Sequence, residues 1–182
     1  VIRRVVAEGK TLAEMEDPVA LIGENGTGKS FFSQCIHNGS PRAKKPYIVI
    51  NAGTIAQQDA ARVLFGSDDG AKPRMGLFEL AGGGTIALQG LGDASEAFFS
   101  CLRQVLLQHS YFAVGGVTTI PFSARLLALV TPEERRRIPR DLWDQLSVFS
   151  LNLPLLKDRQ EDVSTLFRFF LLRESILMPP RT

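Results

Sequence analysis

An eight-residue segment, Gly23 to Ser30, constrains the fold of this chain more than any other feature. It reads Gly-Glu-Asn-Gly-Thr-Gly-Lys-Ser and matches the pattern G-x-x-x-x-G-K-[ST] at every fixed position. Glycines at this spacing let successive backbone N–H groups turn inward around phosphate oxygens. A helix that begins at the end of such a loop points its N-terminus at the bound anion. The loop must therefore connect a buried strand to a helix.

The flanking residues satisfy this requirement. Residues 19–22 are a short apolar run, typical of a buried parallel strand, and residues 29–37 have a helical pattern that ends at Asn38-Gly39. We therefore expect the loop to bind ATP or ADP. Lys29 would reach the outer phosphates, and the Ser30 hydroxyl could ligate Mg²⁺. The candidate nucleotide-binding residues are Gly23, Glu24, Asn25, Gly26, Thr27, Gly28, Lys29 and Ser30.

Strand-like and helix-like segments alternate along the rest of the chain. This alternation predicts an α/β fold with a parallel sheet that helices cover on both faces. Segment 66–76 contains several glycines and Pro73 and is predicted to be a loop. The predicted strands are 19–22, 47–50, 85–88, 124–130 and 148–153, and the predicted helices are 1–14, 29–37, 56–65, 77–81, 94–108, 140–146 and 161–177.

Composition excludes several classes of protein. The net charge of +2 is too small to indicate nucleic-acid binding by this segment. No apolar stretch approaches the ~20 residues that span a bilayer, and no signal peptide opens the chain, so we expect a cytoplasmic protein with no membrane contact. Cys35 and Cys101 lack metal-site spacing and are expected to be buried thiols. Because the chain opens on Val1, we expect it to be a piece of a larger protein.

Further landmarks follow the loop in a fixed order along the chain. They are Ile36-His37-Asn38 with Ser40-Pro41-Arg42, Lys45-Pro46-Tyr47, Leu64-Phe65-Gly66, Phe78-Glu79-Leu80-Ala81 with Gly83-Gly84-Thr85, Val114-Gly115-Gly116, Asp141-Leu142-Trp143 and Leu153-Pro154-Leu155-Leu156. Together they resemble the central AAA+ domain of the bacterial sigma-54-dependent transcription activators, which include the NtrC-type response regulators. The resemblance implies an AAA+ P-loop fold with a Rossmann-like, five-stranded parallel sheet between helices. Residues 1–160 would form the α/β nucleotide-binding core, and residues 161–182 the truncated beginning of a helical lid.

The resemblance also implies a set of partners. The protein would be a bacterial transcription regulator, with a sensory or receiver domain before this segment and a helix-turn-helix DNA-binding domain after it. It would associate with itself as an AAA+-type oligomer, and RNA polymerase is a further candidate partner. DNA would be reached through a domain outside this segment. These expectations follow from the family alone.

The chain departs from the family pattern at the positions that perform hydrolysis. The family's Walker B strand ends in Asp-Glu, where the Asp orders Mg²⁺ and the Glu polarises the attacking water. The matching positions here are Gln89 and Gly90, so Asn51, which restrains that Glu in the family, has lost its partner. Gln89 can still form hydrogen bonds but carries no charge. We therefore name no catalytic residue.

Other working parts of the family also differ. Of the GAFTGA loop that contacts sigma-54, only Gly70-Ala71 remains, and residues 72–75 are too few to complete it. The two arginine-finger positions correspond to Pro139 and Gln145, although Arg140 is adjacent, and the first sensor position corresponds to Thr131. The joint loss of these groups beside an intact loop favours retained binding with lost turnover.

Three hypotheses remain open from the sequence. The first is a regulatory module that binds nucleotide and oligomerises without hydrolysing ATP or acting through sigma-54. The second is a working ATPase whose carboxylate comes from Asp93 or Glu96, just beyond the missing pair. The third is a scaffold whose P-loop is a relic, or a sensor of a cyclic dinucleotide that Arg3 and Arg4 would contact.

Overall fold

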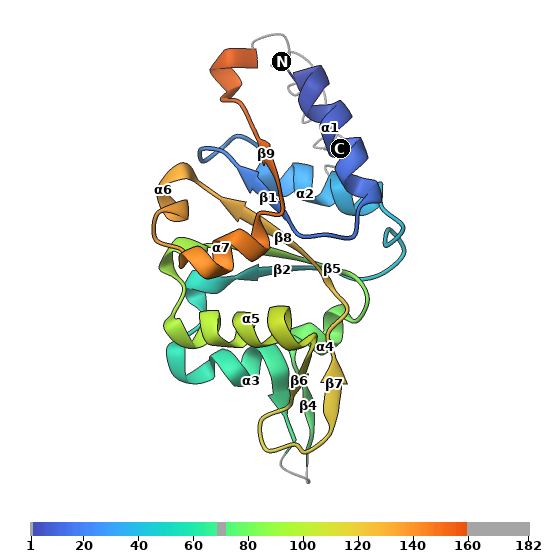
Figure 1. The fold of residues 1–182 in the computed structure, drawn as a ribbon, viewed down its shortest axis with the longest axis vertical. Coiled ribbons are helices and arrows are strands. Elements are labelled where there is room, and N and C mark those ends of the chain that lie inside the picture. Colours follow the sequence, from blue (N-terminus) through green and yellow to red (C-terminus); the bar gives the residue numbers. More distant parts are fainter. Residues whose placement is uncertain (1, 69–71, 160–182) are drawn as a thin grey trace, which may run out of the picture.

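A computed structural model of the chain describes residues 2–68 and 72–159 (Figure 1). Its centre is a five-stranded, fully parallel sheet with the strand order β2-β5-β8-β1-β9. The strands are β1 (Val19–Ile22), β2 (Tyr47–Asn51), β5 (Thr85–Gln89), β8 (Arg125–Val130) and β9 (Phe149–Asn152). The predicted α/β fold with a five-stranded parallel sheet is therefore confirmed, and each predicted strand agrees with the structure to within one residue at either end.

Helices cover both faces of the sheet (Figure 1). On one face, α1 and α2 pack against a core that includes Val19, Leu21 and Leu127. On the other face, α3, α4, α5 and α7 pack against a larger core that includes Ala20 and Ile86. The helices are α1 (Ile2–Glu14), α2 (Lys29–Asn38), α3 (Ala60–Phe65), α4 (Leu77–Ala81), α5 (Glu96–Gln108), α6 (Pro132–Arg135) and α7 (Arg140–Leu146).

Strand β1 shows why the apolar runs are continuous. All four of its side chains are buried, with Val19 and Leu21 in one core and Ala20 and Ile22 in the other. Successive side chains of a strand point to opposite faces, so a strand with helices on both faces needs apolar residues at every position. The four residues before the P-loop therefore anchor it inside the sheet, between β8 and β9.

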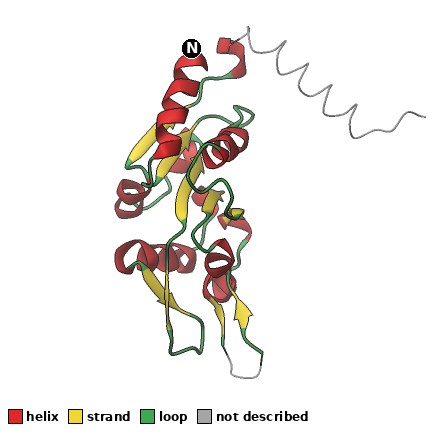
Figure 2. Cartoon of the chain, turned by 90° about the vertical axis from the view of Figure 1, so that its right-hand side faces the viewer, coloured by secondary structure: helices red, strands yellow, loops and turns green. Residues whose placement is uncertain are grey.

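Two antiparallel hairpins extend from the end of the molecule opposite α1 (Figure 2). One pairs β3 (Gly66–Ser67) with β4 (Arg74–Met75), and the other pairs β6 (Ser110–Phe112) with β7 (Thr119–Pro121). The prediction of a plain loop over 66–76 was therefore wrong at both its ends. The prediction of a helix over 56–65 was also too long, because the α-helix begins only at Ala60, after a 3₁₀ turn (Gln57–Asp59).

A buried arginine connects the sheet to the first helix. Arg125, at the start of β8, is 2% exposed, and its guanidinium donates hydrogen bonds to the carbonyl oxygens of Leu12, Ala13 and Asp17. These carbonyls lie at or just beyond the C-terminal end of α1, where oxygens have no partner within the helix and where the helix dipole favours a cation. Arg125 therefore fixes the position of α1 against the sheet.

The two cysteines differ in exposure. Cys101 is buried on α5, as expected, but Cys35 on α2 is exposed, so the expectation of two buried thiols was wrong for Cys35. Residues 2–68 and 72–159 contain no cluster of His, Cys, Asp and Glu that could hold a metal ion. Over the same residues, no helix has the length and apolar character needed to cross a bilayer. The predicted helix 161–177 and the predicted lid lie outside the described residues.

Candidate nucleotide-binding site

The P-loop lies where the sequence places it, between the end of β1 and the start of α2. Gly26 and Gly28 have φ angles of +82° and +89°, in the left-handed region, yet a Cβ at either position would meet no atom within 4 Å. Backbone conformation, and not crowding, is what requires glycine at these two positions. Gly23 is crowded instead, because a Cβ there would lie 2.7 Å from Oγ1 of Thr27.

The Lys29 side chain folds back over the loop. Its Nζ donates hydrogen bonds to the carbonyl oxygens of Gly23 at 2.7 Å and Glu24 at 3.1 Å. Burial lowers the pKa of Lys29, while the nearby carboxylates of Glu134 and Glu24 act in the opposite direction. Thr27 is buried, and its hydroxyl donates to the Glu24 carbonyl at 2.8 Å, which closes the loop on itself. The ammonium group thus lies over the loop, where it can move onto a phosphate oxygen.

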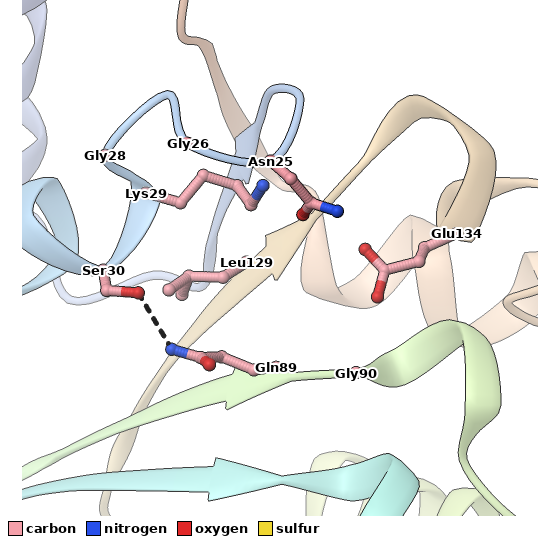
Figure 3. A pocket seen from close by; sticks show the side chains of 9 residues that line it. All are labelled: Asn25, Gly26, Gly28, Lys29, Ser30, Gln89, Gly90, Leu129 and Glu134. Atoms are coloured by element: carbon pink, nitrogen blue, oxygen red, sulfur yellow. Dashed lines mark hydrogen bonds between the residues drawn. The ribbon is translucent and has the colours of Figure 1, made fainter.

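The end of β5 lies beside the start of α2. Nε2 of Gln89 donates a hydrogen bond of 3.0 Å to Oγ of Ser30 (Figure 3). Gly90 follows with φ of +63°, and a Cβ at this position would clash with Oδ1 of Asn51 on the neighbouring strand β2. The Asn51 side chain therefore fills the space in which a side chain at position 90 would begin.

These groups surround a pocket of about 350 Å³ (Figure 3), within the size range of small-molecule sites. Five of the eight predicted binding residues line it. The other three, Gly23, Glu24 and Thr27, take part in the hydrogen bonds that hold the loop together. The described lining residues are Asn25, Gly26, Gly28, Lys29, Ser30, Gln89, Gly90, Leu129 and Glu134.

Sequence reasoning missed two of the described lining residues, the apolar Leu129 and the charged Glu134. Glu134 is the one that brings a functional group into the pocket. It is the third residue of α6, which Thr131 caps: the Thr131 hydroxyl accepts a hydrogen bond from the Glu134 N–H at 3.1 Å, and a Glu134 carboxylate oxygen accepts from the Thr131 N–H at 2.7 Å. The motif Thr-x-x-Glu after an apolar strand is the sequence signal of such a capping box. Figure 3 shows the carboxylate directed into the pocket, on the side opposite Ser30.

Comparison with known proteins identifies the family. A model of the sigma-54 interaction domain matches residues 1–152. The chain belongs to the sigma-54 interaction domain family. The resemblance inferred from the sequence landmarks is therefore confirmed.

Relatives of this sigma-54 interaction domain include the Nif-specific regulatory proteins. Those of Rhodobacter capsulatus and of Sinorhizobium fredii are each 37% identical over 94% of this chain, which spans 31% of either relative. The protein of Azotobacter vinelandii is 33% identical over 93% of this chain and 34% of its own length. The chain thus spans about a third of the length of these curated relatives.

Solved structures confirm the AAA+ fold of the sigma-54 interaction domain. NtrX from Brucella abortus superimposes with a TM-score of 0.84 at 26% identity, over 99% of this chain and 42% of NtrX. The structure of NtrX in complex with ADP gives the same values. The P-loop NTPase domain of the sigma-54 transport activator from E. coli, at 18% identity and a TM-score of 0.55, covers 82% of this chain and 98% of its own length and agrees in fold alone.

The residues beside Ser30 do not fit the magnesium site of a P-loop NTPase. Such a site pairs the P-loop hydroxyl with a carboxylate from the neighbouring strand. In this sigma-54 interaction domain the neighbouring strand presents Gln89, and its NH₂ group, a donor, faces the hydroxyl. The pocket carboxylate, Glu134, lies across the pocket and is held by the Thr131 N–H. The residues around Ser30 therefore do not supply a metal site for catalysis.

The two carboxylates considered for an active enzyme lie in ion pairs outside the pocket. A carboxylate oxygen of Asp93 accepts a hydrogen bond from Arg137 at 2.6 Å, and one of Glu96 accepts from Arg103 at 2.7 Å. Neither residue is among the described residues that line the pocket. Both carboxylates are exposed, so these pairs contribute little stability.

The arginine-finger positions lie around α7. Pro139 caps the helix and Gln145 is half-buried, whereas the side chain of Arg140 is 95% exposed, with Asp144 at 3.9 Å. An arginine that acts on a neighbouring subunit must be exposed, which Arg140 is. Gly70 and Ala71, the remnant of the sigma-54 loop, and the side chains of Arg3 and Arg4 lie outside the described part of the structure.

Proposed function

We propose that this domain binds an adenine nucleotide as a regulatory and oligomerisation module of a bacterial transcription regulator, with little or no ATP hydrolysis. The observation that carries the proposal is the complete P-loop, with Lys29 in place, beside a strand end that presents Gln89 to Ser30. NtrX of Brucella abortus, which has this fold, has been solved in complex with ATP and with ADP. That precedent supports adenine nucleotide as the ligand here.

The expected loss of hydrolysis follows from what phosphoryl transfer needs. The protein must position the nucleotide and neutralise the charge that develops on the transferred group. A group that polarises the attacking water contributes ~10²–10⁴ in rate, and an arginine finger ~10³–10⁵. Gln89 and Gly90 remove the first contribution, and the family's two arginine-finger positions hold Pro139 and Gln145 in place of arginine. Either loss is sufficient to bring turnover close to background.

Thermal melting of the full chain with ADP and with ATP, followed by phosphate release from the same sample, tests this proposal. A nucleotide at about a hundred times its dissociation constant should stabilise the fold by ~2–3 kcal/mol. Lys29→Ala should abolish the shift, whereas Lys44→Ala, which removes an exposed charge, should leave it unchanged. Turnover of about 1 per second that Lys29→Ala abolishes would establish the ATPase alternative. The absence of any shift would establish the scaffold alternative.

We further propose that the protein acts on transcription without contacting sigma-54. The segment that would carry the contact is short, because β3 ends at Ser67 and its partner β4 begins at Arg74. Residues 72–75, Lys-Pro-Arg-Met, supply neither an aromatic ring nor a threonine, and Pro73 stiffens the segment. The regulator's effect on its target promoters should persist in cells that lack sigma-54. Open-complex formation by sigma-54 polymerase that depends on this protein would refute the proposal.

A further inference from the structure

The pocket has opposite charges on its two sides. Lys29 extends from the P-loop, and the Glu134 carboxylate extends toward it from α6, with Asn25 between them (Figure 3). Glu134 places a negative charge in a pocket whose backbone N–H groups and lysine are arranged to hold phosphate, and no carboxylate faces Ser30 from Gln89 to hold a neutralising metal. Two like charges a few ångströms apart repel each other strongly in a partly desolvated site. Glu134 must therefore affect which anions the pocket accepts.

The position of Glu134 is fixed by its own helix. Its carboxylate accepts a hydrogen bond from the Thr131 N–H, and its backbone N–H donates to the Thr131 hydroxyl. Its side chain also packs closely on Gly92, where an added Cβ would lie 2.8 Å from Cγ of Glu134. Rotation of the carboxylate out of the pocket would break the hydrogen bond to Thr131. A bound nucleotide would therefore have to accommodate the carboxylate in its present position.

A phosphate chain held by the P-loop would direct its last group toward the side of the pocket that Glu134 lines. The P-loop N–H groups hold the inner phosphates, and Lys29 reaches the outermost ones. Beyond Lys29 lie the carboxyl ends of β5 and β8, and Glu134 follows the end of β8 after three residues. We therefore expect a third phosphate to extend toward these strand ends and a second phosphate to stay on the loop. In P-loop NTPases a metal ion neutralises the outer phosphates, but Gln89 offers no charge to hold one.

We propose that the pocket selects nucleoside diphosphate over triphosphate and that Glu134 sets this selectivity. The inference rests on the proposed nucleotide binding and adds to it which nucleotide, the diphosphate or the triphosphate, is bound more tightly. The site then reports the ratio of diphosphate to triphosphate, and hydrolysis is not required for it to respond. A repulsion between one carboxylate and one additional phosphate, reduced by solvent and salt, corresponds to a difference in affinity of about tenfold.

Calorimetric titration of the full chain with ADP and ATP, in buffer containing EDTA so that no metal contributes, tests the inference. The informative variant is Glu134→Gln, because a glutamine oxygen can still accept the hydrogen bond from the Thr131 N–H and preserve the capping box. The matched control is Glu133→Gln, which removes the same charge from an exposed position on the same helix. Thermal melting without nucleotide checks that each variant is folded.

The unmodified protein should bind ADP about ten times more tightly than ATP. Glu134→Gln should reduce this ratio toward one by strengthening ATP binding, and Glu133→Gln should leave it unchanged. Equal affinities for ADP and ATP in the unmodified protein would overturn the inference and leave the proposed function intact. An equal gain for both nucleotides in Glu134→Gln, or the same change in Glu133→Gln, would overturn it as well. Failure of both nucleotides to bind would refute the proposed function itself.

Discussion

The amide nitrogen of Gln89 donates a hydrogen bond to the hydroxyl oxygen of Ser30 at 3.0 Å. This contact connects the end of β5 to the first turn of α2 without any charge. The Ser30 oxygen thus accepts a hydrogen bond from the residue that would have to supply a carboxylate if a metal were held here. Among the described residues that line the pocket, the β5 side presents neutral groups and Glu134 supplies the carboxylate.

Gln89→Asp should make nucleotide binding depend on magnesium. An Asp at this position would face the Ser30 hydroxyl with a carboxylate, the ligand that Mg²⁺ prefers. We expect Mg²⁺ to strengthen ATP binding to this variant about tenfold and to affect the unmodified protein much less. Calorimetric titration with and without Mg²⁺ measures the difference. Gln58→Asp, at an exposed position, controls for the added charge, and an equal response of both variants to Mg²⁺ would contradict the prediction.

Gly90→Ala should destabilise the fold through two separable effects. The residue has a left-handed φ angle, and its Cβ would clash with the Asn51 amide oxygen, so we expect a loss of ~2–3 kcal/mol in the free energy of unfolding. Adding Asn51→Gly should recover the part due to the clash. Gly26→Ala, with a similar φ and open space around its Cβ, should cost only ~1–2 kcal/mol. Urea denaturation measures all four proteins, and equal losses at positions 90 and 26 would exclude the clash.

Restoration of the family's two carboxylates should therefore not restore hydrolysis. Gln89→Asp with Gly90→Glu places a bulky residue where Asn51 already lies, and it supplies no arginine. We expect phosphate release from this variant to remain close to background until Gln145→Arg is added and the domain oligomerises. Steady-state phosphate release measures this turnover, and Lys29→Ala in the same background is the control. Turnover of about 1 per second from the double variant alone would show that the arginine is dispensable.

His37 should make the fold less stable in mild acid. The ring is 3% exposed, its Nδ1 lies 2.9 Å from Oγ1 of Thr85, and burial lowers its pKa below the usual 6.5, against a smaller opposing effect of the Lys45 backbone. Because the unfolded chain binds the proton more tightly, this stability is fully present above pH 6.5 and is lost as the pH falls from there through the depressed folded pKa. His37→Gln should flatten the pH dependence of the melting temperature between pH 7 and pH 5, whereas His109→Asn, at an exposed site, should not.

Arg42→Lys should destabilise the contact between the loop after α2 and the segments that precede β1, β5 and β8. The Arg42 guanidinium donates hydrogen bonds to the carbonyl oxygens of Gly84 and Ser123 and to the Glu16 carboxylate. A lysine ammonium cannot reproduce this planar set of donors, and the carbonyl oxygens would lose their partners. We expect a loss of ~1.5–3 kcal/mol in the free energy of unfolding. Arg62→Lys, at an exposed position, should change it by less than ~0.5 kcal/mol.

The parts of the fold that the sequence predicted are those with strong local patterns. Residues 19–22 and 126–130 are apolar throughout because they are buried on both faces, and this pattern can be recognised without a structure. The hairpins formed by 66–67 with 74–75 and by 110–112 with 119–121 escaped prediction, since strands of two or three residues are too short to show any periodicity. Their pairing depends on tertiary contacts.

The parts of the site that escaped prediction depend on strand order. Glu134 is more than a hundred residues from the P-loop and reaches it only because β8 lies next to β1 in the sheet. The contact between Asn51 and Gly90 similarly requires β2 to pair with β5 in a register that places Asn51 opposite Gln89. Sequence spacing alone contains neither relationship. The P-loop, in contrast, is a local motif, and its place between the end of β1 and the start of α2 was predicted from the sequence.

The position of β1 between two strands that come much later in the chain has a consequence for the order in which the chain folds. Its two neighbours in the sheet, β8 and β9, begin at Arg125 and Phe149. More than a hundred further residues must therefore be synthesised after β1 before either partner strand exists. Closing such long loops before any contact forms is entropically costly and slows folding. The P-loop, although close to the start of the chain, should therefore be among the last parts to become rigid. Nucleotide present during refolding should act after the rate-limiting step, by slowing unfolding and not by speeding folding.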